Sequence, residues 1–166
     1  MDTLDVSLAH AEQRLPLQRM LELYQHDLSD LWDQDLDAHG DYGYPLDRHF
    51  ARDAAWPYVF RVDGRYAGFA LVDTQVRLPG GDFWMEQFFV LRKYRRRGVG
   101  ARAACRVFAC HPGRWQVGQM PANTPAQAFW RRVITRHCGG AFAETMLTTG
   151  RWQGLVQSFM SPAPTG

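Results

Sequence analysis

The sequence predicts an α/β fold in a single domain, with a central mixed, mostly antiparallel sheet flanked by helices. Three stretches predict it: antiparallel strands over residues 58–91, a strand–helix–strand unit over residues 83–117, and a helix with a closing hairpin over residues 123–160. The 166 residues suit one domain, large enough to bury roughly 70% of its unfolded surface. We therefore expect residues 1–160 to form one domain and residues 161–166 to form a flexible C-terminal tail.

The N-terminal third is expected to hold one strand and one helix. Residues 4–8 could form a short first strand, and apolar residues from Leu17 to Leu31 recur at helical spacing. Pro16 suits the start of this helix, because its missing N–H is not needed in the first turn. The polar, acidic and glycine-containing residues 33–44 predict a loop or a broken helix.

An antiparallel run of strands follows. Residues 58–62 and 66–76 alternate as strands do, and Asp63-Gly64 between them is a hairpin signal. Pro79-Gly80-Gly81 marks the next turn, and residues 83–91 are apolar on both faces toward their end, as in a central strand. The remaining elements are bounded by glycine, proline or a cap: a helix over 101–109, a strand over 115–117, a helix from Asn123 or Thr124 to about 136, and strands over 141–147 and 152–160.

Composition excludes several classes of protein. The net charge of +2 is too small to predict nucleic-acid binding. No stretch approaches the ~20 apolar residues that span a bilayer, and the N-terminus lacks a signal-peptide pattern, so we expect no membrane partner and a cytoplasmic location. The three cysteines lack the spacing of a metal site, which favours buried free thiols in a reducing compartment and no metal.

The densest chemistry lies at a basic turn. Residues 92–97 hold five of the 19 lysine and arginine residues, and the turn leads from a strand into a helix that begins with Gly98 and Gly100. Glycine lets a backbone approach a ligand closely, and the N–H groups at a helix N-terminus bind anions. The turn therefore predicts a site for a phosphate or pyrophosphate.

The same turn admits other interpretations. A plain glycine turn beside a solvated basic face remains an alternative. A Walker A loop is excluded, because no Gly-Lys-Ser/Thr follows. The stretch from Gly98 to Ala103 satisfies the G-x-G-x-x-A pattern of dinucleotide-binding proteins, but residues 115–121 lack the acidic residue expected ~20 positions later, and alternating βαβ units are missing.

Two motifs together resemble the GNAT superfamily of acetyl-CoA-dependent N-acetyltransferases. Arg95-Arg96-Arg97-Gly98-Val99-Gly100 fits the family's Q/R-x-x-G-x-G/A motif between strand and helix. The stretch from Asn123 to Trp130 resembles its N-x-x-A-x-x-(F/L)-Y helix, and residues 88–94 resemble its fourth strand and the following turn. The resemblance is strong over residues 83–134 and looser over 58–159. It implies the GNAT acyl-CoA acyltransferase fold, with a V-shaped gap between the fourth and fifth strands.

The resemblance implies a role for each matching residue. The backbone N–H groups of the turn would bind the pyrophosphate of acetyl-CoA, and the exposed backbone of the fourth strand would pair with its pantetheine arm. A backbone N–H near Val90 would hold the oxyanion that forms at the acetyl carbonyl. The predicted cofactor-binding residues are Phe88, Phe89, Val90, Arg95, Arg96, Arg97, Gly98, Val99, Gly100, Ala101, Asn123, Ala126, Phe129 and Trp130.

The implied reaction is attack of a neutral primary amine on the acetyl thioester. A free alkyl amine has a pKa near ~10, so a base is needed at neutral pH. Glu86 is the candidate base, because strict alternation would place it on the same face of its strand as Phe88 and Val90. It could instead be a structural ion-pair partner for an arginine.

The sequence departs from the family at the catalytic acid. Trp130 stands where many GNAT enzymes have the tyrosine that protonates the leaving thiolate. Tyr94, a solvent molecule or no acid at all are the alternatives. The same departure motivates a different function, a non-catalytic acyl-CoA-binding sensor or regulatory module.

The acceptor is expected to be a small-molecule or peptide amine, and a cationic one. The resemblance places the acceptor wall in the first helix and the loop after it. That segment is acidic and aromatic, which would attract a cation, although a solvated loop is the alternative. The segment comprises the stretch from Tyr24 to Asp30, followed by Asp33, Asp35, Asp37, Asp41, Tyr42 and Tyr44. The closing strands could also pair between two copies in a homodimer.

Overall fold

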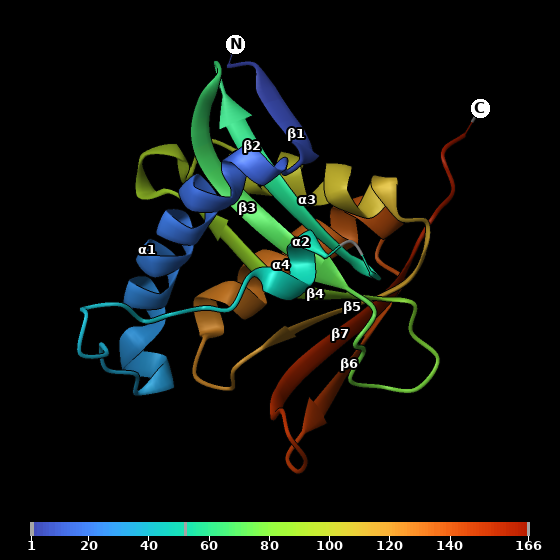
Figure 1. Ribbon diagram of the computed structural model, residues 1–166. Helices are drawn as coiled ribbons and strands as arrows, with labels where there is room; N and C mark the ends of the chain where they lie inside the picture. The colour runs from blue at the N-terminus through green and yellow to red at the C-terminus, as the bar shows by residue number, and fades with distance from the viewer. Residues whose placement is uncertain (1, 52, 166) are drawn as a thin grey trace.

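The computed structural model describes residues 2–51 and 53–165, and its strands form one mixed sheet in the order β1-β2-β3-β4-β5-β7-β6 (Figure 1). Neighbouring strands are antiparallel except β4 and β5, which are parallel. This arrangement confirms the predicted fold class. The helices and strands are β1 (Leu4–Leu8), α1 (Arg14–Trp32), α2 (Asp47–Phe50), β2 (Ala55–Val62), β3 (Arg65–Asp73), β4 (Phe83–Val90), α3 (Val99–Cys110), β5 (Gly113–Gln119), α4 (Thr124–Cys138), β6 (Phe142–Leu147) and β7 (Gly154–Ser161).

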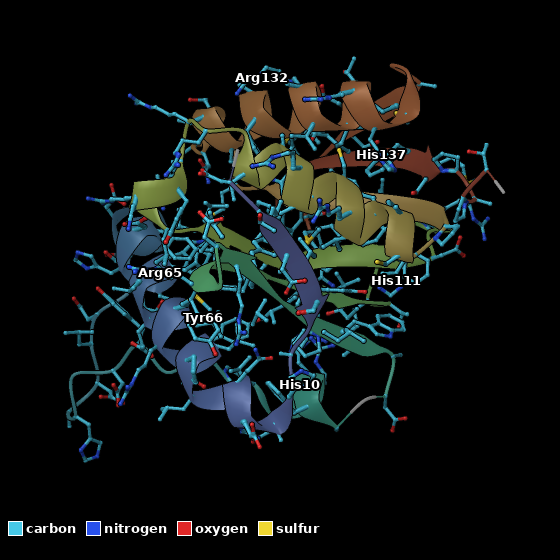
Figure 2. All side chains as sticks on the ribbon, turned by 90° about the horizontal axis from the view of Figure 1, so that it is seen from above. His10, Arg65, Tyr66, His111, Arg132 and His137 are labelled. Atoms are coloured by element: carbon cyan, nitrogen blue, oxygen red, sulfur yellow. The ribbon has the colours of Figure 1, made fainter. Side chains whose placement is uncertain are left out.

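Helices cover both faces of the sheet and bury two separate cores. The view from above shows α3 and α4 on one side of the sheet and α1 on the other (Figure 2). The larger core, around Phe60, Phe108 and Trp115, packs the sheet against α3 and α4. The smaller core, around Leu21 and Phe69, packs the opposite face against α1. The gap where β4 diverges from β5 positions the candidate site.

The N-terminal elements differ from expectation at their ends. Helix α1 begins at Arg14, two residues before Pro16, and ends at Trp32, and the capping residue Asp33 adopts a left-handed conformation. Helix α2 was not predicted, because four residues are too short for a hydrophobic period to show. Strand β2 begins at Ala55, earlier than expected, and Asp63 and Gly64 form the hairpin turn with φ of 48° and 76°.

The β4/β5 junction is the feature of the sheet that matters for function. Only Phe83, Trp84 and Met85 of β4 pair with β5, and the rest of β4 diverges from it. This is the V-shaped gap that the family resemblance implied. A bulge also interrupts the pairing of β4 with β3, since Leu71 pairs with Gln87 whereas the next residue, Val72, pairs with Met85.

The C-terminal strands close the sheet out of sequence order. Strand β7 lies between β5 and β6. Ser161, which we expected to begin the tail, is the last residue of β7 and is buried, and its hydroxyl donates to the carbonyl of Phe108 at 2.9 Å. The three cysteines are free thiols, and Cys110 is exposed rather than buried. Across the described residues, the helices are too short or too polar to cross a bilayer.

Candidate functional site

The basic turn between β4 and α3 forms a cradle of backbone N–H groups. Arg96 and Gly98 both adopt left-handed conformations, with φ of 61° and 72°. The first helical hydrogen bond of α3 runs from the N–H of Arg102 to the carbonyl of Gly98. The N–H groups of the residues between them are therefore not used by the helix and are free for an anion. A Cβ built on Gly98 would meet no protein atom within 4 Å, so the cradle is open.

A groove of about 1080 Å³ extends from this cradle between α1, β4 and α4. It brings together most of the predicted cofactor residues: Phe88, Phe89, Val90, Arg95, Arg96, Gly98, Gly100, Ala101, Asn123, Ala126 and Phe129. Three of the predicted residues do not line the groove: Trp130, which lines a neighbouring cavity, Arg97 and Val99. Arg97 turns away to pair with Asp2, and Val99 is fully buried in the core, so these two can contribute only their backbone.

The backbone of β4 presents alternate residues to the gap. The N–H of Leu91 donates to the carbonyl of Ala67 at 2.8 Å, toward β3. Alternation then directs the backbone of Val90 and Phe88 toward the gap. Consistent with this, the carbonyl of Val90 accepts a hydrogen bond from Nε of Arg95 at 2.7 Å.

Phe89 corrects one expectation about this strand. It pairs with Phe69 of β3, and its carbonyl oxygen would clash with a Cβ added to Gly68. Its backbone therefore points toward β3 and cannot pair with a pantetheine arm in the gap. Phe89 can contribute to the groove only through its side chain, over which the guanidinium of Arg95 lies 5.3 Å from the ring centroid.

Sequence reasoning missed two charged groups of the groove and gave a third a different role. Arg132 and Arg136 of α4 line it beside Phe129. They follow Phe129 by three and seven residues, a spacing that places side chains on one face of a helix, and this spacing could have identified them from the sequence. Asp27 of α1, which was expected in the acceptor wall, lines the groove instead and accepts hydrogen bonds from Arg92 at 2.8 Å and Arg95 at 2.6 Å. Burial raises the pKa of Asp27, but these two arginines outweigh it and hold the pKa below its ordinary value.

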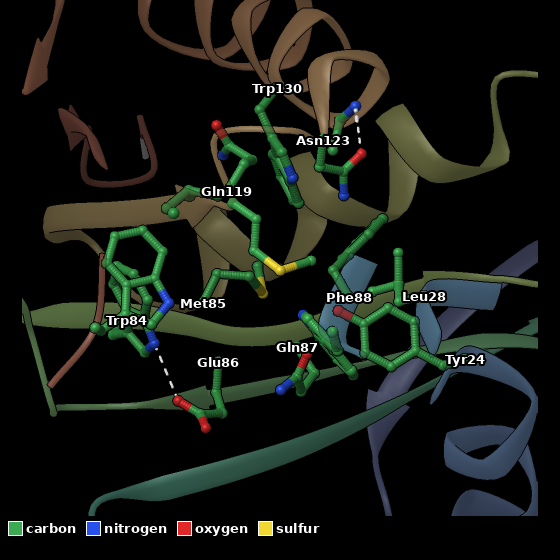
Figure 3. A pocket seen from close by; sticks show the side chains of 16 residues that line it. Tyr24, Leu28, Trp84, Met85, Glu86, Gln87, Phe88, Gln119, Asn123 and Trp130 are labelled. Atoms are coloured by element: carbon green, nitrogen blue, oxygen red, sulfur yellow. Dashed lines mark hydrogen bonds between the residues drawn. The ribbon is translucent and has the colours of Figure 1, made fainter. Parts of the chain in front are cut away.

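A second cavity of about 170 Å³ lies in the gap itself (Figure 3). It shares Tyr24, Leu28, Phe88, Asn123 and Ala126 with the groove, so the two spaces adjoin. We call this second cavity the gap pocket. Asn123 also caps α4, with its side chain accepting from the N–H of Ala126, and Trp130 lines the gap pocket rather than the groove.

Glu86 lies at the edge of the gap pocket and is held from two sides. Its carboxylate accepts hydrogen bonds from the Tyr44 hydroxyl and the Trp84 indole N–H, each at 3.0 Å, and Arg77 lies 3.8 Å away. The bulge places Glu86 on the face of Trp84, opposite Phe88 and Val90, so the expectation from strict alternation is wrong. Glu86 therefore presents a carboxylate to the gap pocket and also forms an ion pair with Arg77.

Tyr94 and Tyr24 are the two tyrosines to compare as candidate proton donors. Tyr94 is packed in the larger core and lines neither cavity. Tyr24 lines both, at their junction, and its ring is fixed by edge contacts with Trp32 and Phe69. Burial, followed by the charge of Glu86, raises the pKa of Tyr24, so its hydroxyl stays protonated at neutral pH. Figure 3 shows this hydroxyl reaching from α1 toward β4.

The acidic loop after α1 does not face the pocket. Asp33, Asp35, Asp37 and Asp41 line neither cavity. Asp37 instead accepts from the backbone N–H groups of His39 and Asp41, and Glu22 accepts from those of Tyr42 and Gly43. These contacts fold the loop against α1 and bring Tyr44 to Glu86. Within the described residues, the acidic, cysteine and histidine side chains form no cluster that could hold a metal ion.

Comparisons with known proteins agree with this geometry. The model of the acetyltransferase (GNAT) family matches residues 17–134. No curated protein sequence matches the chain significantly.

Among solved structures, an acetyltransferase from Thermus thermophilus is 16% identical, with a TM-score of 0.69 over 95% of this chain and 97% of that one. A putative acetyltransferase from Salmonella typhimurium, solved with its cofactor acetyl-CoA, is 16% identical, with a TM-score of 0.63 over 98% and 96% of the two chains. The ribosomal-protein-S18-alanine N-acetyltransferase from Escherichia coli is 15% identical, with a TM-score of 0.61 over 98% and 97%. At these identities the structural likeness concerns the fold.

Proposed function

Because the chain belongs to the GNAT acetyltransferase family, we propose that it transfers the acetyl group of acetyl-CoA to a primary amine. The observation that carries this proposal is that the two cavities adjoin and share five lining residues. The groove begins at a basic cradle suited to phosphates, and it ends in a pocket that contains a carboxylate. An acetyl donor and an amine acceptor would meet at the residues that the two cavities share.

The proposed cofactor site fits a polyphosphate ligand. The backbone N–H groups from Arg96 to Ala101 would hold the pyrophosphate, since helix N-termini and left-handed turns bind anions. Arg132 and Arg136 would add positive charge along the same groove. The backbone of Phe88 and Val90 faces the gap and would pair with the pantetheine arm like an added strand.

The proposed chemistry uses three groups of the chain. Acetyl-CoA supplies an activated acetyl thioester when bound. Glu86 accepts a proton from the attacking amine, directly or through water, and so keeps the amine nucleophilic. The N–H of Val90 stabilises the negative charge that develops on the acetyl oxygen. Tyr24 donates a proton to the leaving sulfur, in place of the tyrosine that Trp130 replaces.

Calorimetric titration with acetyl-CoA tests the cofactor site. Gly98→Trp fills the open cradle, and we expect it to weaken binding by more than about tenfold, because the bulk excludes the phosphates. Gly40→Trp is a matched control, since Gly40 also has a left-handed backbone, with φ of 80° and no atom within 4 Å of an added Cβ, but lies in the exposed loop. Failure of the wild-type protein to bind acetyl-CoA would refute the proposal.

Turnover separates the enzyme from a non-catalytic acyl-CoA sensor, which the replacement of the usual tyrosine by Trp130 favours. Release of free CoA thiol is measured with a panel of amines at saturating acetyl-CoA. Tight binding without turnover on any amine would support the sensor. Amine-dependent thiol release, with the acetylated amine found by mass spectrometry, would support the transferase.

A further inference from the structure

We propose that the gap pocket accepts a primary amine carried by one compact apolar group, such as a single aromatic ring or a short branched alkyl chain. Polyamines, aminoglycosides and peptide termini would then be poor acceptors. This inference rests on the proposed acetyl transfer and names the substrate class of the same site. Three properties of the pocket carry it: its size, its walls and its charge.

The size of the pocket limits the acceptor to about one ring. Its volume is about 170 Å³, and an apolar protein cavity of roughly 150 Å³ holds one benzene molecule. A group of that size fills the pocket and exchanges its water for apolar contact, which is favourable. A larger rigid acceptor, such as a multi-ring sugar, would have to leave most of its surface outside.

Four indole rings are among the walls of the pocket, beside the polar side chains of Gln87, Gln119 and Asn123. Trp32, Trp84, Trp130 and Trp152 all line it. Trp84 and Trp130 are 3% and 5% exposed, and the rings of Trp84 and Trp152 meet edge to face with centroids 5.4 Å apart. Figure 3 shows Trp84 and Trp130 at separate sides of the pocket, with Glu86 on the β4 side. These flat rings favour contact with one aromatic or branched alkyl group and tolerate one ammonium over a ring face.

The charge of the pocket suits one ammonium and no more. Glu86 is the only charged side chain among the described residues that line it. Arg77 lies 3.8 Å from the carboxylate and repels a further cation. A second ammonium would therefore lose its hydration against indole rings without a counter-charge, which is unfavourable. The exposed aspartates of the loop line neither cavity and cannot supply that charge inside the pocket.

An acceptor panel tests this inference. Initial rates of CoA thiol release are measured at saturating acetyl-CoA with 2-phenylethylamine, isoamylamine, spermidine, kanamycin and an alanine-initiated peptide. We expect kcat/KM for the two monoamines to exceed the others by at least about tenfold, the factor that a well-formed aromatic contact can supply. A preference for spermidine, kanamycin or the peptide would overturn the inference.

Two variants test the walls and the charge separately. Trp152→Ala removes one wall, and we expect KM for 2-phenylethylamine to rise about tenfold while the Kd for acetyl-CoA stays unchanged, because Trp152 does not line the groove. The matched variant Asp33→Asn/Asp35→Asn/Asp37→Asn should leave both values unchanged. A rise in KM in the triple-aspartate variant, with no rise in Trp152→Ala, would place acceptor recognition on the loop instead.

The two proposals fail in different ways. If acetyl-CoA does not bind, the transferase proposal fails and the acceptor class fails with it. If acetyl-CoA binds and polycations are acetylated faster than the monoamines, the transferase proposal stands and only the acceptor class is refuted.

Discussion

Replacing Glu86 with glutamine isolates its proposed role as a base. The glutamine amide can preserve both hydrogen bonds of the carboxylate, with its oxygen accepting from the Trp84 N–H and its NH₂ donating to the oxygen of Tyr44. Only the partly exposed ion pair with Arg77 is lost, which is worth about 1 kcal/mol at most. We therefore expect Glu86→Gln to fold with nearly wild-type stability in urea denaturation.

The activity of this variant should fall far more than its stability. Loss of a positioned base typically costs about 100-fold to 10,000-fold, which we expect in kcat at pH 7. The deficit should shrink as the pH approaches the pKa of the acceptor amine, near ~10 for an alkyl amine, because the amine then loses its proton without help. Thiol release measured from pH 6 to 10 follows both effects.

Glu144→Gln is a matched control for this experiment. Glu144 also forms an ion pair, with Arg131, but lines neither cavity, so its loss should leave kcat unchanged. An unchanged kcat and pH profile in Glu86→Gln would refute the base and assign Glu86 to structure alone.

Three further perturbations follow from named contacts. Tyr24→Phe should lower kcat at least about tenfold without changing the Kd for acetyl-CoA, whereas Tyr94→Phe should not, and equal kcat values in the two variants would exclude Tyr24 as the acid. Gly68→Ala places a Cβ against the carbonyl oxygen of Phe89, so unfolding in urea should show a loss of about 1–3 kcal/mol. Burial and the charge of Arg48 lower the pKa of His49 to about 4. This value lies below the pKa of histidine in the unfolded chain, about 6.5, so buried neutral His49 stabilises the folded state. Its contribution to the free energy of unfolding is complete above pH 6.5 and is lost as the pH falls to about 4. The loss in the free energy of unfolding amounts to about 3 kcal/mol, and an equal loss in His49→Leu would refute this role of His49.

The fold could be predicted from the sequence because its signals are local and agree with one another. The hairpin signal Asp63-Gly64, the cap at Asn123 and the apolar period of the first helix each determine one element. Their order then leaves few arrangements of the sheet. Where local signals were weak, as in the four residues of α2, the element was missed.

The candidate site was predictable only in part, because some of its residues meet through tertiary structure. The turn from Arg95 to Gly100 carries its own pattern, so its residues can be named from the sequence. The bulge after Met85 has no sequence signal, and it moved Glu86 to the opposite face from the one that alternation predicts. Tyr24 and Glu86 are far apart in sequence and approach the same pocket only because α1 packs across β4.

The divergence of β4 from β5 leaves an edge inside the sheet, where most sheets have edges only at their sides. The unpaired N–H and C=O groups of such an inner edge can pair with an extended segment of another chain, which promotes aggregation. A pantetheine arm bound there would cover that edge as a removable strand. A ligand at 100 times its Kd adds about 2.7 kcal/mol to the stability of a folded protein. Under the proposed function, the acetyl donor would therefore stabilise the folded protein in addition to serving as its substrate.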